Sequence, residues 1–295
     1  MSSAEIAAQQ IKAMSDDELR ILILLDKHLK RFEIFPLETL RNLSGFTLKY
    51  LRKLTSSLEE KNLILTLKTP YEGATLLTAG LDLLALNALT ASDVVEFFGR
   101  KIGVGKESDI FDGITPEGER ISLKFYRIGR ISFRDVARKR AYVPPESRVP
   151  WLLRSINAAR REFTALKELY ARGVSVPRPI ARDRHVVTME YLEGEIVAYA
   201  KKVLNPEIVL EETLRIVGDA YEAGLVNADL SSYNVFVTVD ERVIIIDWPQ
   251  AVRSSAKAAP MKLQRDVRNL CDYFERRFGT QVDYKEEYEK IISRG

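Results

Sequence analysis

The chain has 295 residues, 46% of them hydrophobic, which is enough for about two domains with buried cores. Its 45 basic and 42 acidic residues nearly cancel, so the net charge of +3 is weak support for a nucleic-acid partner. One cysteine excludes an intrachain disulfide and two histidines exclude a zinc cluster, so any metal must have oxygen ligands. No apolar run approaches the ~20 residues of a membrane span, and the N-terminus has no signal-peptide core. These patterns predict a cytoplasmic protein without a membrane partner.

The first 90 residues have the pattern of a winged helix. Apolar residues recur at helical spacing, Ser15 can cap the first helix, and two strand-like runs surround a turn rich in breakers. We predict helices at residues 15–30, 36–42, 46–62 and 79–89, and a hairpin at residues 63–69 and 74–78.

In a winged helix the third helix enters a nucleic-acid groove, where Lys49, Arg52 and Lys53 would meet phosphates. The alternative is a solvated helix face, because winged helices also serve as protein-docking modules.

Residues 94–129 alternate in the manner of antiparallel strands separated by glycine-rich turns. The turn at residues 103–108, GVGKES, offers glycines for close backbone approach, together with Lys106 and Ser108, all suited to phosphate oxygens. Alone it is weak support, because such turns occur by chance and this one lacks the P-loop spacing.

A lysine and a glutamate on consecutive elements form a candidate pair. Lys124 lies on the face of a strand opposite the apolar one, together with Ser122 and Tyr126. Glu162 borders the apolar stripe of a helix predicted at residues 156–170. Such a pair can aim the ammonium group at nucleotide phosphates, as kinases require, although each residue can equally be structural.

Residues 127–150 carry seven basic residues against two acidic ones and have few apolar anchors. The segment indicates a mobile, partly helical loop that grips an anionic partner such as RNA, through Arg138, Lys139 and Arg140, or that shields an active site. A disordered, solvated connector is the alternative.

Residues 184–195 indicate a strand that ends near Met189 with a polar exit. If this is the hinge between two lobes, backbone groups near Glu190 and Leu192 would bind an adenine ring, and Met189 would line its pocket. That interpretation depends on the flanking motifs.

Residues 224–250 carry the central chemistry. Asp229 precedes a polar loop, Asn234 opens an apolar strand, and Asp247 ends the next strand, thirteen residues after Asn234. A hairpin of that length can bring the amide and the second acid together on a magnesium ion. Asp229 is then left to position an accepting hydroxyl, which completes the set that phosphoryl transfer needs. A single acid at a strand end is often a plain turn former.

The ordered set of turn, Lys124, Glu162, Asp229 with Asn234, and Asp247 resembles the protein-kinase-like superfamily. Within it, GVGKES, EFTALKELYARGVSVPRPI, DLSSYNVFV and IIDWPQAV are similar to the RIO kinases of the type-two branch, over nearly the whole chain. In lacking a long C-terminal extension, the chain resembles the archaeal members of this branch. The resemblance implies an α+β fold, with a winged-helix domain at 1–90 and a bilobal protein-kinase-like domain at 91–295, its lobes at 91–190 and 195–295.

The resemblance also implies roles for single residues. Asp229 is the catalytic acid/base, and Asn234 and Asp247 are metal ligands, with Asp247 also the position that accepts a phosphoryl group. Lys124 contacts the nucleotide phosphates with Glu162 as its partner. The residues expected to cover the triphosphate are Gly103, Gly105, Lys106, Glu107 and Ser108.

The implied function is serine/threonine phosphorylation or ATP hydrolysis, with Mg²⁺ or Mn²⁺, in late maturation of the small ribosomal subunit. The pre-small-subunit particle and its ribosomal RNA are the implied partners. Asn227 and Ala228 stand where the family usually has His-Gly, and Trp248 where most members have Phe. A nucleotide-sensing assembly factor with little catalysis and a small-molecule phosphotransferase therefore stay open. A transcription regulator would leave two thirds of the chain unexplained.

Overall fold

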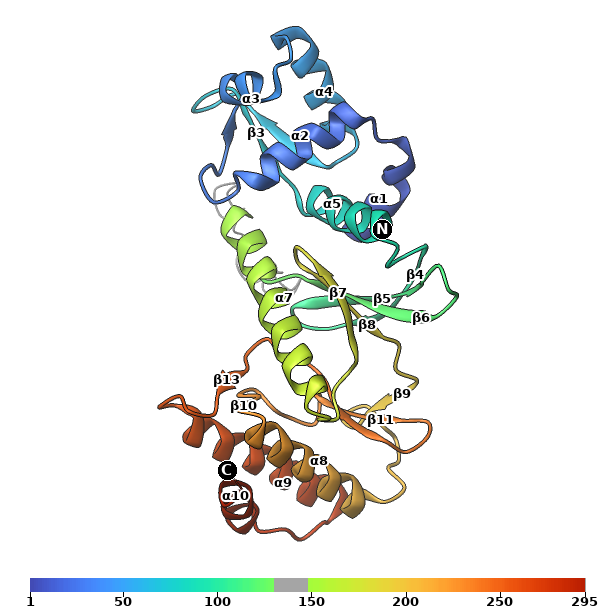
Figure 1. Ribbon diagram of the computed structural model, residues 1–295, viewed down its shortest axis with the longest axis vertical. Helices are drawn as coiled ribbons and strands as arrows, with labels where there is room; N and C mark the ends of the chain where they lie inside the picture. Colours follow the sequence, from blue (N-terminus) through green and yellow to red (C-terminus); the bar gives the residue numbers. More distant parts are fainter. Residues whose placement is uncertain (130–147, 295) are drawn as a thin grey trace. The chain divides into compact units, whose positions relative to one another are not determined.

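A computed structural model describes residues 1–129 and 148–294 (Figure 1). The chain forms two compact units, Met1–Ala159 with Ala181–Thr188 and Arg160–Ile180 with Met189–Gly295. It crosses from one unit to the other within α7 (Arg148–Ala171), within β7 (Pro179–Asp183) and within β8 (Val186–Glu190). No helix in the described ranges is long and apolar enough to cross a membrane.

The first unit begins with a winged helix, as predicted. Its strands form a small antiparallel sheet in the order β1-β3-β2. The predicted helices and hairpin are confirmed, whereas α1 and β1 were not foreseen. The elements are α1 (Ser3–Gln10), a 3₁₀ turn (Ile11–Ala13), α2 (Asp16–Lys27), β1 (Phe35–Pro36), α3 (Leu37–Ser44), α4 (Leu48–Glu60), β2 (Ile64–Leu67), β3 (Gly73–Leu76) and α5 (Thr78–Ala91).

Helix α2 begins where the sequence predicts. Ser15 Oγ accepts a hydrogen bond from the Glu18 backbone N at 3.3 Å, and the Glu18 carboxylate accepts one from the Ser15 backbone N at 3.0 Å. This reciprocal capping box satisfies two amide groups that the first turn of a helix otherwise leaves unpaired.

Helix α5 is buried on nearly every side, because all its residues from Ala79 to Leu86 are buried. It packs against α1. The one charged residue in that run, Asp82, is fully buried, which requires a compensating partner.

The same unit contains most of a five-stranded sheet in the order β4-β5-β6-β8-β7. Its first strands are β4 (Phe97–Val104), β5 (Ser108–Ile114) and β6 (Arg120–Tyr126), and they pair antiparallel as predicted. Register shifts in β4 bend the strand near Lys101. Rings of Phe98, Phe111 and Phe125 pack on one another with centroids 4.9–6.0 Å apart.

The second unit is mainly helical, with α8, α9 and α10 packed against one another (Figure 1). Its small sheets have the orders β12-β11-β9 and β10-β13. The elements are β9 (Gly194–Ile196), α8 (Pro206–Glu222), β10 (Leu225–Val226), β11 (Val235–Thr238), β12 (Val243–Ile245), β13 (Val252–Arg253), α9 (Ala259–Phe278) and α10 (Tyr284–Ile292).

Helix α8 starts at Pro206, which occupies its first turn, after Asn205. The Asn205 side chain makes no capping hydrogen bond, so the start is set by the proline rather than by an asparagine cap. The helix ends before Gly224, whose φ of 87° lies in the left-handed region that favours glycine.

Candidate active site

The β11–β12 hairpin brings two of the predicted site residues together. Val235 lies opposite Ile245, and the Ile246 backbone N donates to the Asn234 backbone O at 2.9 Å. Asn234 therefore lies across from Ile246, the residue immediately before Asp247. Neighbours of this kind in an antiparallel pair are separated by about 5 Å between Cα atoms. The spacing of thirteen residues thus places Asn234 and Asp247 at the same end of the hairpin, and their sharing of a metal ion stays a prediction.

This pair has the chemistry of a magnesium site. An amide oxygen and a carboxylate are hard oxygen donors, and Mg²⁺ is commonly held by one or two such groups together with phosphate and water oxygens. Within the described ranges no group of three or more His, Cys, Asp or Glu side chains could hold a metal alone. The Asn234 amide oxygen accepts hydrogen bonds from the backbone N and the Oγ of Ser231, both at 2.9 Å, which fix its orientation.

Asp229 is held close to the same hairpin by the side chain of Asn227. The Asn227 Nδ2 donates to the Asp247 backbone O at 3.0 Å, and its Oδ1 accepts from the Asp229 backbone N at 3.2 Å. Asn227 is buried, whereas the Asp229 side chain is exposed. One buried amide thus connects the loop of Asp229 to the segment of Asp247 and leaves the Asp229 carboxylate accessible to a substrate.

A buried carboxylate on α9 supports this loop and was not foreseen. Asp266 accepts hydrogen bonds from the backbone N of Ala228 at 2.7 Å and of Leu230 at 3.3 Å, the residues on either side of Asp229. Burial raises the pKa of Asp266, against the lowering effects of Arg265 and of these two N–H groups. The available signal was its spacing, three residues after Leu263 on the buried face of α9.

Two non-glycine residues of this site have left-handed backbone conformations. Ala228 has a φ of 66° and Asp247 a φ of 71°. Such conformations cost on the order of 1–2 kcal/mol each for a residue with a Cβ, and they collect at functional sites. The hydrogen bonds from Asn227 and to Asp266 hold these strained segments in place.

Glu162 and Trp248 anchor the segment after Asp247. Both are 1% exposed, and the Glu162 carboxylate accepts from the Trp248 backbone N at 3.2 Å. The Trp248 indole Nε1 donates to the Ile245 backbone O at 2.8 Å. The tryptophan is therefore a core anchor with its polar group satisfied. The predicted pairing of Glu162 with Lys124 joins residues of different units and stays a prediction.

The glycine-rich turn of the first unit connects β4 to β5. The Gly105 backbone N donates to the Ser108 backbone O at 2.8 Å, which closes the turn, and Lys106 and Glu107 are exposed. The Arg127 backbone N donates to the Glu107 backbone O at 2.6 Å and ties the turn to the end of β6. Gly103 pairs with Ile110 within the sheet.

The face of β6 that carries Lys124 is buried rather than solvated, which argues against Lys124 being an ordinary surface lysine. Ser122, Lys124 and Tyr126 are 8%, 7% and 3% exposed, so the strand is buried on both faces. An alternating pattern predicts one solvated face, but β6 is an interior strand of the five-stranded sheet. Burial of Lys124 makes a purely solvated role untenable, because a buried ammonium needs partners.

The predicted hinge residues follow the point where the chain passes from Thr188 to Met189, that is, from the first unit to the second. Met189, Glu190 and Leu192 are all partly exposed. The Glu190 carboxylate accepts from the Arg178 backbone N at 2.8 Å, and its own backbone N donates to the Arg178 backbone O at 3.0 Å. These contacts fix Glu190, and adenine binding stays a prediction.

On α4, Lys49, Arg52 and Lys53 are all exposed, as nucleic-acid contacts must be. Arg52 is already engaged, because its Nε and Nη2 donate to the Glu72 carboxylate at 3.0 and 2.8 Å. Arg138, Lys139 and Arg140 lie outside the described residues.

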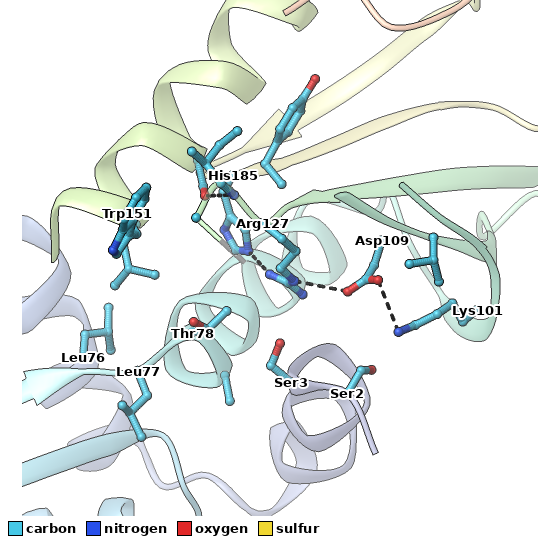
Figure 2. Close-up of a pocket in the computed structure, with 17 residues that line it drawn as sticks. Ser2, Ser3, Leu76, Leu77, Thr78, Lys101, Asp109, Arg127, Trp151 and His185 are labelled. Atoms are coloured by element: carbon cyan, nitrogen blue, oxygen red, sulfur yellow. Dashed lines mark hydrogen bonds and ion pairs between the residues drawn. The ribbon is translucent and has the colours of Figure 1, made fainter. Parts of the chain in front are cut away.

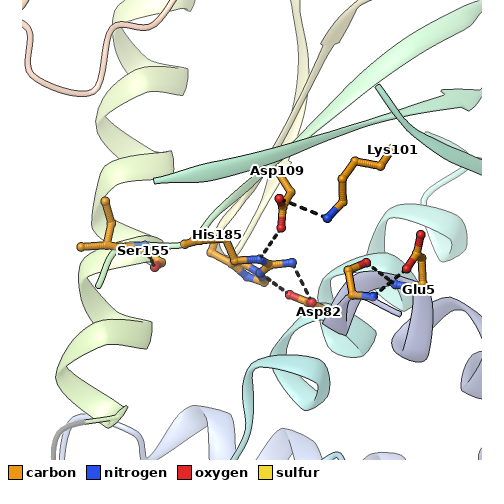
Figure 3. Close-up of polar contacts among 9 residues, drawn as sticks. Glu5, Asp82, Lys101, Asp109, Ser155 and His185 are labelled. Atoms are coloured by element: carbon orange, nitrogen blue, oxygen red, sulfur yellow. Dashed lines mark hydrogen bonds and ion pairs between the residues drawn. The ribbon is translucent and has the colours of Figure 1, made fainter. Parts of the chain in front are cut away.

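Arg127 does not belong to the basic loop to which the sequence assigned it. It is 7% exposed, and both terminal nitrogens donate to the Asp82 carboxylate at 2.8 Å, as a bidentate pair with α5. Figure 3 labels Asp82 in this cluster, together with His185 and Asp109. Burial opposes the charge of Asp82, yet Arg127 and His185 hold its pKa at about 2. A fully buried carboxylate requires a cation as its partner, and the sequence around Arg127 does not reveal that it is this cation.

His185 completes this buried cluster. Its Nε2 lies 2.6 Å from the Asp82 carboxylate, and burial lowers the pKa of the imidazole against the effect of Asp82. We therefore assign the neutral ring with a proton on Nε2 that donates to Asp82. A cavity of about 800 Å³ lies beside the cluster, with Lys101, Asp109, Arg127 and Trp151 in its wall (Figure 2).

Comparisons with known proteins agree with this architecture. The family model of the RIO domain matches residues 109–287, and that of the Rio2 N-terminal domain matches residues 11–92. The chain therefore belongs to the RIO family.

Within that family the chain lies in the Rio2 branch. It is 32% identical over 279 residues to the serine/threonine-protein kinase rio2 of Schizosaccharomyces pombe, over 92% of this chain and 80% of that protein. It is 34% identical over 218 residues to the RIO-type serine/threonine-protein kinase Rio2 of Methanocaldococcus jannaschii, over 72% of this chain and 80% of that protein. It spans about half of some longer relatives, such as 51% of rio2 from Dictyostelium discoideum.

The fold is also that of a solved relative. The crystal structure of the Rio2 kinase-ADP/Mg²⁺-phosphoaspartate complex from Chaetomium thermophilum has a TM-score of 0.84 and 30% sequence identity to this chain. The match covers 95% of this chain and 88% of that one.

Proposed function

We propose that this protein is an ATP- and magnesium-dependent phosphotransferase that acts as a serine/threonine kinase or an ATPase. The observation that carries the proposal is the Asn227 side chain, which ties Asp229 to Asp247 beside Asn234. The side chains of Asp229, Asn234 and Asp247 are the minimum that phosphoryl transfer needs from this part of a kinase. Its curated relatives are named serine/threonine-protein kinases, and the structural relative is an ADP/Mg²⁺ complex.

Each residue has a proposed role. Asp229 orients the acceptor hydroxyl and takes its proton, and Asn234 and Asp247 hold Mg²⁺, or Mn²⁺ in its place. The metal supplies charge neutralisation at the phosphates. Lys124, with Glu162 as partner, binds the phosphates, and backbone groups near Glu190 and Leu192 bind adenine beside Met189. The proposed cover of the triphosphate is Gly103, Gly105, Lys106, Glu107 and Ser108.

Asp247 is also proposed to accept the phosphoryl group. A carboxylate oxygen attacks the γ-phosphorus of ATP, the bond to the bridging oxygen breaks, and ADP leaves with the electron pair. Water then attacks the aspartyl phosphate, which releases phosphate and a proton and restores the carboxylate. The structural relative whose name includes a phosphoaspartate supports this route.

We further propose that the protein acts in maturation of the small ribosomal subunit, with the pre-small-subunit particle and its ribosomal RNA as partners. The winged helix supports this proposal, because its exposed Lys49 and Lys53 suit a phosphate backbone.

A nucleotide-sensing factor with little catalysis is the second candidate. It is favoured by Ala228, which has a φ of 66° where the family usually has glycine. The resulting strain can leave Asp229 less well placed for catalysis.

The test compares ATP turnover with ATP affinity in wild type, Asp229→Ala and Asp247→Ala. We expect both variants to bind a fluorescent ATP analogue and to lose about 100-fold or more of phosphate release. Asp240→Ala is the matched control, because Asp240 is an exposed acid in the turn of the same hairpin. Wild-type turnover no faster than that of the two variants, with ATP still bound, supports the sensor. Transfer of the phosphoryl group to a sugar or an antibiotic at a higher rate than to water would favour the small-molecule phosphotransferase.

A further inference from the structure

The second unit has an apolar groove at the end of the β11–β12 hairpin that lies away from Asn234 and Asp247. A cavity of about 330 Å³ is bounded by β9, the start of α8 and the hairpin turn. We call it the α8 groove, with Leu204, Ile208 and Val239 on its walls and Val197, Val209 and Val243 at its floor.

The walls of the α8 groove expose apolar surface that the fold does not use. Leu204, Ile208 and Val239 are 70%, 57% and 71% exposed, whereas the floor residues are almost fully buried. Single exposed aliphatic residues are common on proteins, whereas apolar residues grouped around one cavity are typical of interaction sites. The volume is at the small end of ligand cavities, which suits a few side chains of an extended segment.

The rim of the groove is acidic. Glu195, Glu212 and Glu241 line it against a single cation, Lys202. Glu212 is engaged with Arg215 at 2.7 Å, whereas Glu195 and Glu241 are exposed and form no ion pair in the part of the chain that the structure describes. A negative rim around an apolar floor attracts cations flanking aliphatic side chains.

The backbone offers a second mode of contact. β9 is one of the two edge strands of the β12-β11-β9 sheet, with Glu195 paired to Val237, and an edge strand can accept a further strand from a partner. The groove residues Val237 and Val239 lie three and five residues from Asn234, roughly 10–17 Å along the strand. The buried floor comes closer to the site, because the Val197 backbone N donates to the Val235 backbone O at 2.9 Å. An anchor held between the exposed wall residues Leu204, Ile208 and Val239 therefore leaves the Asp229 loop uncovered.

We propose that the α8 groove docks a short extended segment of a partner protein, in which basic residues flank two aliphatic anchors. The anchors enter between Leu204, Ile208 and Val239, and the basic residues lie against Glu195 and Glu241. The groove is separate from the residues of phosphoryl transfer, so docking and catalysis can fail independently.

The test measures fluorescence anisotropy of two labelled nonapeptides with the full chain. One carries three arginines followed by leucine and valine at alternate positions, and the other carries glutamates in place of the arginines. We expect the basic peptide to bind with a Kd on the order of 10 µM and the acidic peptide not to bind. Leu204→Asp with Ile208→Asp should weaken binding about tenfold or more.

The charged rim is tested by Glu195→Lys with Glu241→Lys, which should weaken binding at low salt and much less at high salt. Met261→Asp is the control, because Met261 is 70% exposed on α9 and outside the groove. All variants alter exposed side chains and should keep the wild-type melting temperature and ATP turnover.

Three results would overturn the proposal. The first is no binding of the basic peptide to wild type, and the second is equal binding to the Leu204→Asp, Ile208→Asp variant. The third is a wild-type dimer in sedimentation that this variant abolishes, because the groove would then belong to a second copy of the chain.

Discussion

The side chain of Asn227 joins two segments that are twenty residues apart in the sequence. A carboxamide has a permanent donor and a permanent acceptor, and Asn227 uses both, toward the Asp247 backbone O and from the Asp229 backbone N. A neutral histidine can also supply one donor and one acceptor, but it loses the acceptor when it is protonated. Asparagine at this position therefore preserves the connection and removes its dependence on pH.

We predict that Asn227→Ala lowers turnover by about 10-fold or more with little change in KM, because it releases Asp229 and Asp247 without touching ATP. The loss of two partly buried hydrogen bonds should also lower the free energy of unfolding by about 1–3 kcal/mol. Asn227→His should restore part of the turnover above about pH 6.5 and lose it below, since imidazolium cannot accept the Asp229 N–H. A pH profile for Asn227→His that is parallel to wild type would contradict this positioning role.

At the scale of elements, Glu18 connects the start of α2 to the end of α4. Its carboxylate caps α2 through Ser15 and also accepts from Ser57 Oγ at 2.7 Å and Lys61 Nζ at 2.5 Å. Burial by itself would raise the pKa of Glu18, but hydrogen bonds from Lys61, Ser15 and Ser57 lower it to about 2. The folded state therefore favours the ionised carboxylate relative to the unfolded chain.

This linkage predicts the pH dependence of the winged helix. Because the folded pKa is depressed from 4.5 to about 2, the stabilisation by Glu18 is complete above pH 4.5 and lost as pH falls toward 2. Glu18→Gln should lower the melting temperature at pH 7 and differ progressively less from wild type below pH 4.5. Glu38→Gln is the control, since Glu38 is exposed and pairs only with Arg41 in the described residues. A difference for Glu18→Gln that is constant from pH 7 to pH 3 would disprove the linkage.

The elements were predictable from the sequence because their signals are local. The Ser15 cap, the hairpin of β2 and β3, and the proline at the start of α8 depend on residues within a few positions of one another. The meeting of Asn234 and Asp247 at one end of a hairpin was predictable for the same reason, because a single hairpin connects them.

The long-range partners were not predictable. The sequence places Arg127 in a basic loop, because its partner Asp82 is 45 residues away and local patterns cannot reveal it. The sequence gives no sign that Asp266 supports the Asp229 loop. Its partners are backbone N–H groups 36 and 38 residues away, and backbone groups carry no sequence signal. The cost of a left-handed Ala228 is likewise invisible until the backbone conformation is known.

At the scale of the whole molecule, the proposed partner is a ribosomal particle, and its affinity should depend on salt. Each phosphate contact contributes about 0.7–0.9 to the slope of log affinity against log salt concentration. The three basic residues of α4 are not equivalent in this respect. Arg52 is paired with Glu72, whose pKa Arg52 lowers, whereas Lys49 and Lys53 form no ion pair within the described residues and can meet phosphate directly.

We predict that Lys49→Gln with Lys53→Gln reduces the salt slope for a small-subunit ribosomal RNA fragment by about 1.4–1.8, and that Arg52→Gln reduces it by less than the value of one contact. Lys285→Gln on α10 is the control for loss of charge elsewhere on the molecule. Neutralising Arg138, Lys139 and Arg140 together tests the basic segment in the same assay. If the lysine pair and this triple variant both leave the slope unchanged, neither the winged helix nor the basic segment binds the RNA backbone. An equal effect of Arg52→Gln and of the single lysine variants would instead show that phosphate displaces Glu72 from Arg52.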